Sequence, residues 1–443
     1  MRVKQPGPSS RAGQPRRAIL VGSDAETLPE LAELARSAGV LPLEILPLRS
    51  GAVDPATLVT RGKLEELHSL CHRLTPDLIL VDDELSPAVQ RNLEDYLDVR
   101  VLDRTQLILD IFAQRAHTRE GALQVELAQL TYLLPRLAGR GGALSRLGGG
   151  IGTRGPGETR LETDRRRVRR RIAWLRTQLA QVEGRRQQVR DRRRQHELAL
   201  VALVGYTNAG KTSLLNALTQ AGAAAEDRLF ATLDPLTRRL VLPGCGSVLV
   251  TDTVGFIRKL PHQLVAAFRA TLEEAVDADV LIHVIDIHAP DCLAQKAVVE
   301  QVLQELGAGG KPLIEAYNKV DLLPSPALPW MRSGLSSAST DEARRPSGDP
   351  EGGLGPVRPW GRVMVSARTG FGLDSLKQLL AAYVARHEQE ATFLFPYDRL
   401  GELRRLHDDG RVISTRYTPA GVAVRAMISP HLAARLSAWR HNS

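Results

Sequence analysis

The chain has little cysteine for its length. Its 443 residues include only three cysteines, Cys71, Cys245 and Cys292, which lie far apart in the sequence. Their separation matches no zinc-ligand spacing and fits the reduced thiols of a cytosolic protein. We therefore expect a cytoplasmic protein.

Long apolar runs are also missing. The longest, such as the run at Val280, are interrupted by polar residues well before the ~20 apolar residues that a membrane-spanning helix needs. Residues 1–16 are basic, rich in proline and glycine, and lack an apolar core, which excludes a secretory signal and predicts a disordered basic tail. With 43% hydrophobic and 25% charged residues, the composition is that of a soluble globular protein, long enough for about three domains.

The positive charge is concentrated in one segment. The net charge is +9, and residues 158–196 alone hold fourteen arginines against five acidic residues. The surplus of that segment equals the surplus of the whole chain. Such a focused excess favours nucleic acid as the partner, with an acidic membrane surface, bound weakly, as the alternative.

Residues 17–115 alternate short apolar runs with helical patterns. RAILVG, LPLEILPL, DLILVDD and VRVLD are typical of strands, and the segments between or beside them are typical of helices. This alternation predicts an N-terminal α/β domain with a parallel sheet.

Residues 116–197 are predicted to form a helical hairpin. Leucines 123, 127, 130, 134 and 137 recur at spacings of four and three, and Val168, Ile172, Leu175, Leu179 and Val182 repeat the rhythm. The loop between the arms, 139–157, holds nine glycines and three arginines without an acid. It is either a flexible linker or a tip that enters folded RNA. The candidate RNA contacts are Arg140, Arg146, Arg154, Arg165, Arg166, Arg167, Arg169, Arg170 and Arg171.

A phosphate-binding pattern follows. Residues 198–213, LALVALVGYTNAGKTS, combine an apolar strand, a G-x-x-x-x-G-K-T loop and a helix start. The glycines let backbone N–H groups surround phosphate oxygens, and the helix adds its positive N-terminal dipole. Lys211 is expected to reach the β- and γ-phosphates, and the Thr212 hydroxyl to bind Mg²⁺.

Further GTPase elements occur in order, each at the carboxyl end of a predicted strand. Asp252 opens a D-x-x-G motif and is expected beside Mg²⁺ through water, whereas Gly255 N–H contacts the γ-phosphate. The Asp321 carboxylate accepts two guanine hydrogen bonds that adenine cannot donate. Thr232 is the candidate switch threonine on Mg²⁺, although FATLD could also be an ordinary turn.

The candidate catalytic residues are Lys211, Thr232, Asp252 and Gly255. The candidate nucleotide-binding residues are Gly205, Asn208, Ala209, Gly210, Lys211, Thr212, Ser213, Phe230, Ala231, Thr232, Leu233, Asp234, Asp252, Thr253, Val254, Gly255, Asn318, Lys319, Val320, Asp321, Ser366, Ala367 and Arg368.

Phe256 stands where Ras-type enzymes carry the glutamine that orients the attacking water. A phenyl ring cannot hydrogen-bond that water, so we predict slow intrinsic GTP hydrolysis that a partner accelerates. Asn208 lies where some GTPases hold a K⁺ ion in place of an arginine finger, which makes K⁺ a second candidate cation after Mg²⁺.

The remaining segments complete a multidomain α/β architecture. The Ras-like GTPase domain is predicted at 198–390, interrupted by a Pro/Ser/Gly-rich insertion at 324–360 that we expect to be disordered. Residues 391–443 contain the strand-like runs RVISTRY and GVAVRAMI and predict a small α+β C-terminal domain.

These stretches together resemble the HflX family of translational GTPases. The resemblance covers roughly residues 18 to 430 and rests on GGGIGTRGPGETRLETDRR, GYTNAGKT, LFATLDP, DTVGFI and NKVD. It implies Mg²⁺ on Thr212 and Thr232, and binding of the large ribosomal subunit and its rRNA. It also implies separation of stalled or idle ribosomes, with the glycine-rich loop near the peptidyl-transferase region. The insertion and the N-terminal tail depart from the family pattern.

Three functional hypotheses follow. The first is a monomeric GTPase whose GTP state controls association with the large subunit and the splitting or recycling of ribosomes. The second is a GTP-dependent regulatory module acting at a membrane surface or on a protein partner. The third is an RNA-remodelling ATPase, although residues 1–197 contain no second phosphate loop.

Overall fold

The chain forms two compact units. The computed structural model describes residues 15–48, 54–137, 156–194, 198–220, 229–230, 232–233, 235–243, 246–259, 269–323, 359–386, 389–399, 401, 403, 406–407, 410–428, 433 and 436–440. The N-terminal unit comprises the described residues up to Val182 together with Leu229, Phe230 and Lys259. The nucleotide unit comprises the other described residues. Most of the predicted tail, insertion and hairpin loop lies outside the described residues, although β1 already begins at Arg16.

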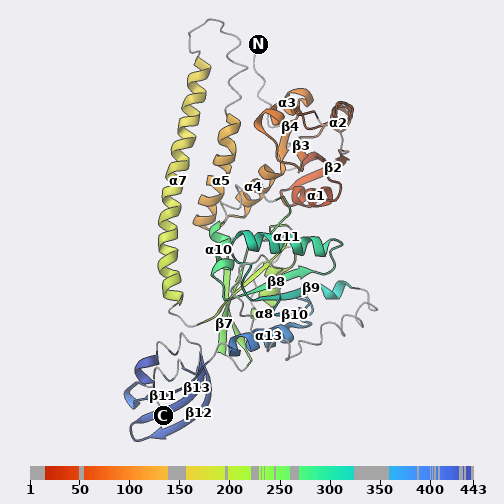
Figure 1. Ribbon diagram of the computed structural model, residues 1–443. Helices are drawn as coiled ribbons and strands as arrows, with labels where there is room; N and C mark the ends of the chain where they lie inside the picture. The colour runs from red at the N-terminus through yellow and green to blue at the C-terminus, as the bar shows by residue number, and fades with distance from the viewer. Residues whose placement is uncertain are drawn as a thin grey trace. The chain divides into compact units, whose positions relative to one another are not determined.

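The N-terminal unit is built on a parallel sheet, as the strand–helix alternation predicted. The sheet order is β2-β1-β3-β4, and all neighbours pair in parallel. The elements, visible in Figure 1, are β1 (Arg16–Gly22), α1 (Leu28–Ser37), β2 (Val40–Pro47), α2 (Arg61–Leu74), β3 (Leu78–Val81), α3 (Pro87–Leu97), β4 (Arg100–Asp103) and α4 (Arg104–Arg115).

Helices cover both faces of this sheet. α2 and α3 bury leucines such as Leu67 and Leu93 on one face, and α1 and α4 pack on the other. The strand order reverses between β1 and β3, and at such a reversal the loops after the two strands diverge and leave a crevice. Ser23 follows β1 at this point, and Asp82 and Asp83 follow β3.

The predicted helical hairpin is present as two antiparallel helices, α5 (Arg119–Leu137) and α7 (Pro156–Arg194) (Figure 1). Arg119 hydrogen-bonds Gln178, and Arg171 forms a two-pronged pair with Glu126 at 2.7 and 2.8 Å. From the first contact to the second, the position moves seven residues toward the C-terminus of α5 and seven residues toward the N-terminus of α7, as expected for antiparallel helices.

The most buried stripe of α5 differs from the predicted leucine seam. Val125, Ala128 and Tyr132 are buried, whereas Leu127 and Leu130 are only half-buried. The reason is that α5 also packs against α4, and this contact buries a further face of α5.

The nucleotide unit contains a six-stranded sheet of order β10-β9-β8-β5-β7-β6. All pairs are parallel except β6 with β7. The strands are β5 (Leu200–Gly205), β6 (Leu236–Leu242), β7 (Gly246–Asp252), β8 (Val280–Asp286), β9 (Leu313–Asn318) and β10 (Gly361–Met364). The edge strand β6 was not predicted, since its Thr-Arg-Arg centre interrupts the apolar pattern.

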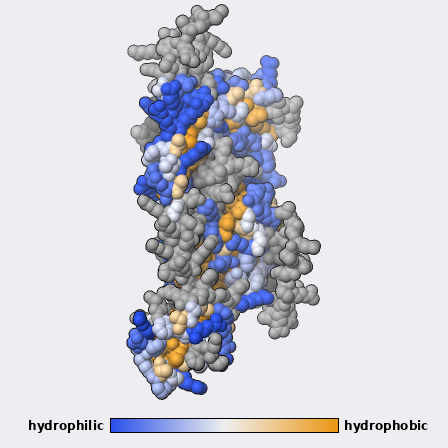
Figure 2. Space-filling model, turned by 60° about the vertical axis from the view of Figure 1, so that its left-hand side comes forward, coloured by the Kyte–Doolittle hydropathy of each residue, from blue (hydrophilic) through white to orange (hydrophobic). Residues whose placement is uncertain are grey.

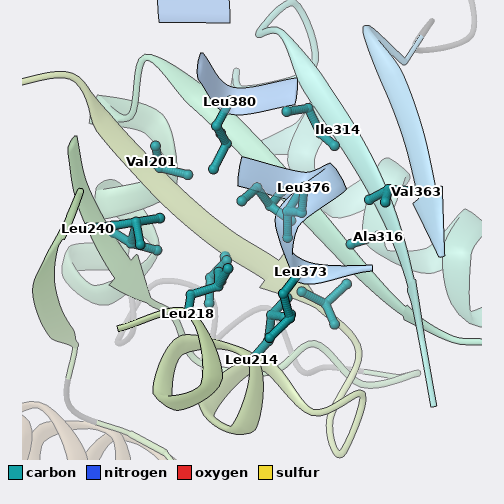
Figure 3. Packing of buried hydrophobic residues seen from close by; sticks show 14 of the residues in the cluster. Val201, Leu214, Leu218, Leu240, Ile314, Ala316, Val363, Leu373, Leu376 and Leu380 are labelled. Carbon is teal, nitrogen blue, oxygen red and sulfur yellow. The ribbon is translucent and has the colours of Figure 1, made fainter. Parts of the chain in front are cut away.

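Helices enclose this sheet on both faces. On one face, α8 (Lys211–Thr219) and α13 (Leu373–Arg386) direct Leu214, Leu218, Leu373, Leu376 and Leu380 toward the strands (Figure 3). On the other face lie α10 (Arg269–Asp277) and α11 (Cys292–Glu305). A short 3₁₀ turn, η1 (Val320–Leu322), follows β9.

The C-terminal segment forms a three-stranded antiparallel sheet of order β11-β13-β12. Its elements are β11 (Gln389–Phe395), η4 (Tyr397–Arg399), β12 (Arg411–Thr418), β13 (Gly421–Ile428) and η5 (Leu436–Trp439). The sequence predicted β12 and β13 but not β11. The multidomain α/β fold class is confirmed. Among the described residues, no helix combines the length and apolarity needed to cross a bilayer.

We predict that the contact of α13 with the sheet stabilises the nucleotide unit. Leu376→Ala should lower the free energy of unfolding by about 2–5 kcal/mol, because a fully buried leucine leaves a cavity when truncated. Urea unfolding followed by fluorescence or circular dichroism measures the change. The control Gln378→Ala, at an exposed position of the same helix, should leave stability nearly unchanged; equal effects of both would contradict the prediction.

Candidate nucleotide site

Parallel pairing brings the candidate nucleotide-binding segments to one edge of the sheet. Leu203 of β5 pairs with Asp252 of β7, and Asp286 of β8 pairs with Asn318 of β9. The loops that follow these strands therefore start at the same edge. This is the edge at which open α/β sheets bind ligands.

The phosphate loop requires its glycines. Gly210 has φ +89° and lies where a Cβ would meet Asn318 Nδ2 at 2.4 Å. Asn208 also adopts a left-handed conformation, with φ 62°. α8 starts directly after this loop, so the loop N–H groups and the helix N-terminus form a cradle suited to an anion.

Lys211 is buried inside this cradle. Its ammonium donates to the backbone oxygens of Gly205 at 3.1 Å and Tyr206 at 2.8 Å. Burial lowers the pKa of Lys211 to about 8, against the opposing attraction of Asp252. The ammonium is thus held in place while its charge is incompletely compensated, which suits a group that binds phosphate oxygens.

Three oxygen-bearing side chains meet beside Lys211. Thr212 Oγ1 lies 2.6 Å from Thr232 Oγ1 and donates to Asp252 Oδ2 at 2.6 Å. Asp252 is fully buried, burial raises its pKa, and its Oδ1 has no hydrogen-bond partner among the described residues.

An unpaired buried carboxylate oxygen next to two hydroxyls fits Mg²⁺, which takes oxygen ligands and retains several waters. Among the described residues, no group of three or more His, Cys, Asp or Glu side chains is arranged to hold a metal ion.

The D-x-x-G segment is attached to the phosphate loop by its backbone. Phe256 N–H donates to Gly205 O at 3.1 Å, and Thr207 N–H donates to Phe256 O at 2.7 Å. The Phe256 ring is buried, at 1% exposure. A Cβ on Gly255 would meet Lys211 Nζ at 3.0 Å. Gly255 therefore lies directly beside the lysine.

The sequence missed Tyr206 as a site residue. Its hydroxyl accepts a hydrogen bond from Arg258 N–H at 2.8 Å and so fixes the chain after D-x-x-G. Its only signal was its position inside the phosphate loop.

Asn318 links the loop after β10 to the phosphate loop. Its amide donates to Ala209 O at 2.9 Å and accepts from Ala367 N–H at 3.0 Å. Ser366 Oγ donates to Asp321 Oδ1 at 2.6 Å. The exposed Asp321 is thereby oriented, and the second, structural role of Asn318 was not anticipated.

Lys319 has φ 65° and pairs with Asp286 at 2.7 Å. Asp286, at the end of β8, was missed because it belongs to no recognised motif.

The other candidates are placed as follows. Leu233, Thr253, Val254 and Val320 are buried, Ser213 is half-buried on α8, and Arg368 is exposed. Phe230 groups with the N-terminal unit. Ala231 and Asp234 lie outside the described residues.

The candidate RNA-contacting arginines fall into three groups. Arg140, Arg146 and Arg154 lie outside the described residues. Arg165, Arg166, Arg167, Arg169 and Arg170 project from α7, all exposed except the half-buried Arg165. Arg171 is engaged with Glu126 and stacks over Trp174 at 4.2 Å. Figure 2, with the left-hand side of Figure 1 turned forward, shows hydrophilic residues gathered on the upper part of that side, with some hydrophobic residues among them.

A buried P-loop lysine, a Thr–Thr–Asp oxygen cluster, a D-x-x-G segment and an N-K-x-D loop on one parallel sheet define a P-loop GTPase. Three family models match in succession: GTP-binding GTPase N-terminal at 25–113, GTP-binding GTPase Middle Region at 115–193, and 50S ribosome-binding GTPase at 200–319.

Curated relatives match along most of the chain. A GTPase HflX of Caldanaerobacter subterraneus is 47% identical over 95% of this chain and 92% of that protein. The Escherichia coli GTPase HflX is 43% identical over 84% and 82%, respectively. The chain belongs to the HflX family of GTPases, and it is an enzyme that hydrolyses GTP.

Among solved structures, a GTP-binding protein of Sulfolobus solfataricus in complex with GDP matches with a TM-score of 0.44 at 24% identity, covering 84% of this chain and 99% of that one.

The lowered pKa of Lys211 predicts proton uptake on nucleotide binding. Near pH 8 about half of the free protein carries a neutral amine, and adjacent phosphates favour the ammonium. GDP binding should therefore take up a fraction of a proton, and affinity should fall as pH rises from 8 to about 9. Calorimetric titration in two buffers of different ionisation enthalpy measures the uptake. Lys211→Arg, which stays charged, is the control; equal uptake by both proteins would contradict the prediction.

Proposed function

We propose that the site binds guanine nucleotides with the roles that its geometry favours. Lys211 contacts the β- and γ-phosphates, Thr212 and Thr232 bind Mg²⁺, and Asp252 acts through water. Asp321 and Asn318 select guanine. The hydrogen bonds of Ser366 and Asn318, and the unpaired oxygen of Asp252, support these assignments.

In the proposed reaction the protein contributes mainly position and charge. Mg²⁺, when bound, neutralises charge developing on the β- and γ-phosphate oxygens. Lys211 and the Gly255 N–H stabilise the transferred phosphoryl group from the protein side. Phe256 is buried and provides no group to orient water. Intrinsic hydrolysis is therefore slow, and a partner that orders the switch segments accelerates it. A K⁺ ion beside Asn208 stays a prediction.

We further propose that the GTP state controls docking on the large ribosomal subunit and thereby the splitting or recycling of ribosomes. One observation carries this proposal: the exposed arginines of α7. Within the described part of the chain Arg167, Arg169 and Arg170 form no ion pair, so their charge is available to phosphates. The name of the third family model, 50S ribosome-binding GTPase, points to the same partner.

Base selection is testable at Asp321. Asp321→Asn replaces one of the two carboxylate acceptors for guanine by an amide donor, and a lost hydrogen bond of this kind costs ~1–3 kcal/mol, so GTP affinity should fall by roughly tenfold or more. The preference for GTP over ATP should shrink in parallel, measured by competition with a fluorescent nucleotide. Asp374→Asn, at a fully exposed position of α13, should change neither value. Unaltered selectivity in Asp321→Asn would refute the assignment.

Docking is testable through charge. Replacing Arg167 and Arg170 by Gln should weaken binding to purified large subunits and lower the slope of log K against log salt concentration by about 2, one per lost phosphate contact. Sedimentation with a non-hydrolysable GTP analogue and with GDP measures both affinity and nucleotide dependence. The charge-matched control replaces Arg36 and Arg73, which are exposed in the N-terminal unit.

Two results would count against ribosome docking. One is an equal loss in the control variant. The other is binding to anionic vesicles that exceeds binding to subunits, which would favour the membrane alternative.

A further inference from the structure

Two short segments of the GTPase motifs belong to the N-terminal unit. Phe230 lies two residues before Thr232, and Lys259 lies four residues after Gly255, yet both group with the first part of the chain. The chain thus passes from one unit to the other next to each of the two segments that are expected to respond to the γ-phosphate.

Lys259 is bound by carboxylates after strand β3. Its ammonium lies 2.8 Å from Asp82 Oδ2 and 2.9 Å from Asp83 Oδ1. Asp82 is fully buried and also pairs with Arg104 at 2.6 Å, and Arg104 in turn pairs with Glu30. Lys259 thus brings a second positive charge to the buried Asp82, beside that of Arg104, and also neutralises Asp83. The crevice at the strand-order reversal is therefore a seat for a cation, and Lys259 fills it.

The pKa values of both partners agree with this assignment. Burial opposes both charges, but the hydrogen bonds of Lys259 and Ser23 hold the pKa of Asp83 below its ordinary value. The hydrogen bonds that Lys259 donates to Asp82 and Asp83 likewise raise the pKa of Lys259 against its partial burial.

Phe230 is held by an aromatic contact. Its ring packs edge-to-face on Phe112 of α4 with centroids 4.6 Å apart, and both rings are at least 98% buried. Such a pair is worth about 0.5–1.5 kcal/mol beyond the burial of its area.

Both residues have a left-handed backbone, with φ 57° at Phe230 and 52° at Lys259. This conformation costs about 1–2 kcal/mol for a residue with a bulky side chain, so it persists where surrounding contacts impose it. The side-chain contacts with Phe112, Asp82 and Asp83 are those constraints.

Only a few residues of chain separate Phe230 and Lys259 from residues of the nucleotide site. Phe256 and Arg258 are fixed to the phosphate loop through their backbone, directly before Lys259. Thr232 lies within hydrogen-bonding distance of Thr212, two residues after Phe230. The held side chains thus coexist with the arrangement in which Thr232 closes on the proposed Mg²⁺ ligands.

We propose that Asp82, Asp83 and Phe112 are positioning residues of the GTPase, which hold Lys259 and Phe230 so that Thr232 and Gly255 close on the γ-phosphate. The inference rests on the proposed roles of Thr232 and Gly255. The N-terminal unit then acts on hydrolysis without touching the nucleotide.

The test uses the full-length protein and Lys259→Met, which removes the charge and keeps the aliphatic stem. We expect GTP turnover to fall about tenfold, the scale of a slightly misplaced reacting group. Affinity for a non-hydrolysable GTP analogue should also fall, whereas GDP affinity stays constant because GDP lacks the γ-phosphate. Phe230→Leu should change the same values in the same direction.

Several controls separate positioning from folding. Lys259→Arg should retain activity, and Lys63→Met, which breaks a 2.8 Å surface pair with Glu66, should have no effect. The double variant Asp83→Asn with Lys259→Met should lose no more turnover than Lys259→Met alone, since the two replacements remove the same interaction. Thermal unfolding checks that each variant is folded; Lys259 is 36% exposed, so its replacement leaves no buried cavity.

The proposal is overturned if Lys259→Met raises turnover, or leaves both turnover and the ratio of GTP to GDP affinity unchanged. It is also overturned if the losses caused by Asp83→Asn and Lys259→Met multiply in the double variant. Thr232→Ala distinguishes the two levels of the argument. If it lowers GTP affinity while Lys259→Met does not, only the positioning role fails; if neither changes it, the proposed site roles fail as well.

Discussion

Parallel strand pairing is the constraint on which the nucleotide site depends. Pairing of β5 with β7 and β8, and of β8 with β9, fixes which residues reach the same sheet edge. Lys211, Asp252 and Asn318 are separated by many residues in the chain, yet this register places them beside one loop. The apolar helices α8 and α13 stabilise the sheet and thereby keep that register.

Two buried ionisable groups of the site are only partly compensated. Lys211 is enclosed by backbone oxygens with a lowered pKa, and Asp252 is buried with one oxygen unpaired. Buried charged groups without full compensation are costly to the folded protein. On the proposed roles, a ligand that brings both phosphate and a divalent cation would satisfy both groups at once, so the energetic cost in the free protein would become selectivity in the complex.

Local patterns made much of this architecture predictable. The phosphate loop, D-x-x-G and N-K-x-D are each defined by adjacent residues, and apolar runs marked most of the parallel strands. The edge strands β6 and β11 were missed, because an edge strand exposes polar side chains and loses the apolar signature. The cation seat that Lys259 fills could not be predicted from the sequence either, because its contact with Asp82 joins residues 177 positions apart and neither residue belongs to a local pattern.

Asn318 gives the binding site a property that no single motif has. One amide donates to the backbone of the phosphate loop and accepts from the loop after β10, so its orientation cannot change on one side alone. The two loops are therefore tied into one unit, and a displacement of either loop has to break its hydrogen bond to Asn318 or carry the other loop with it.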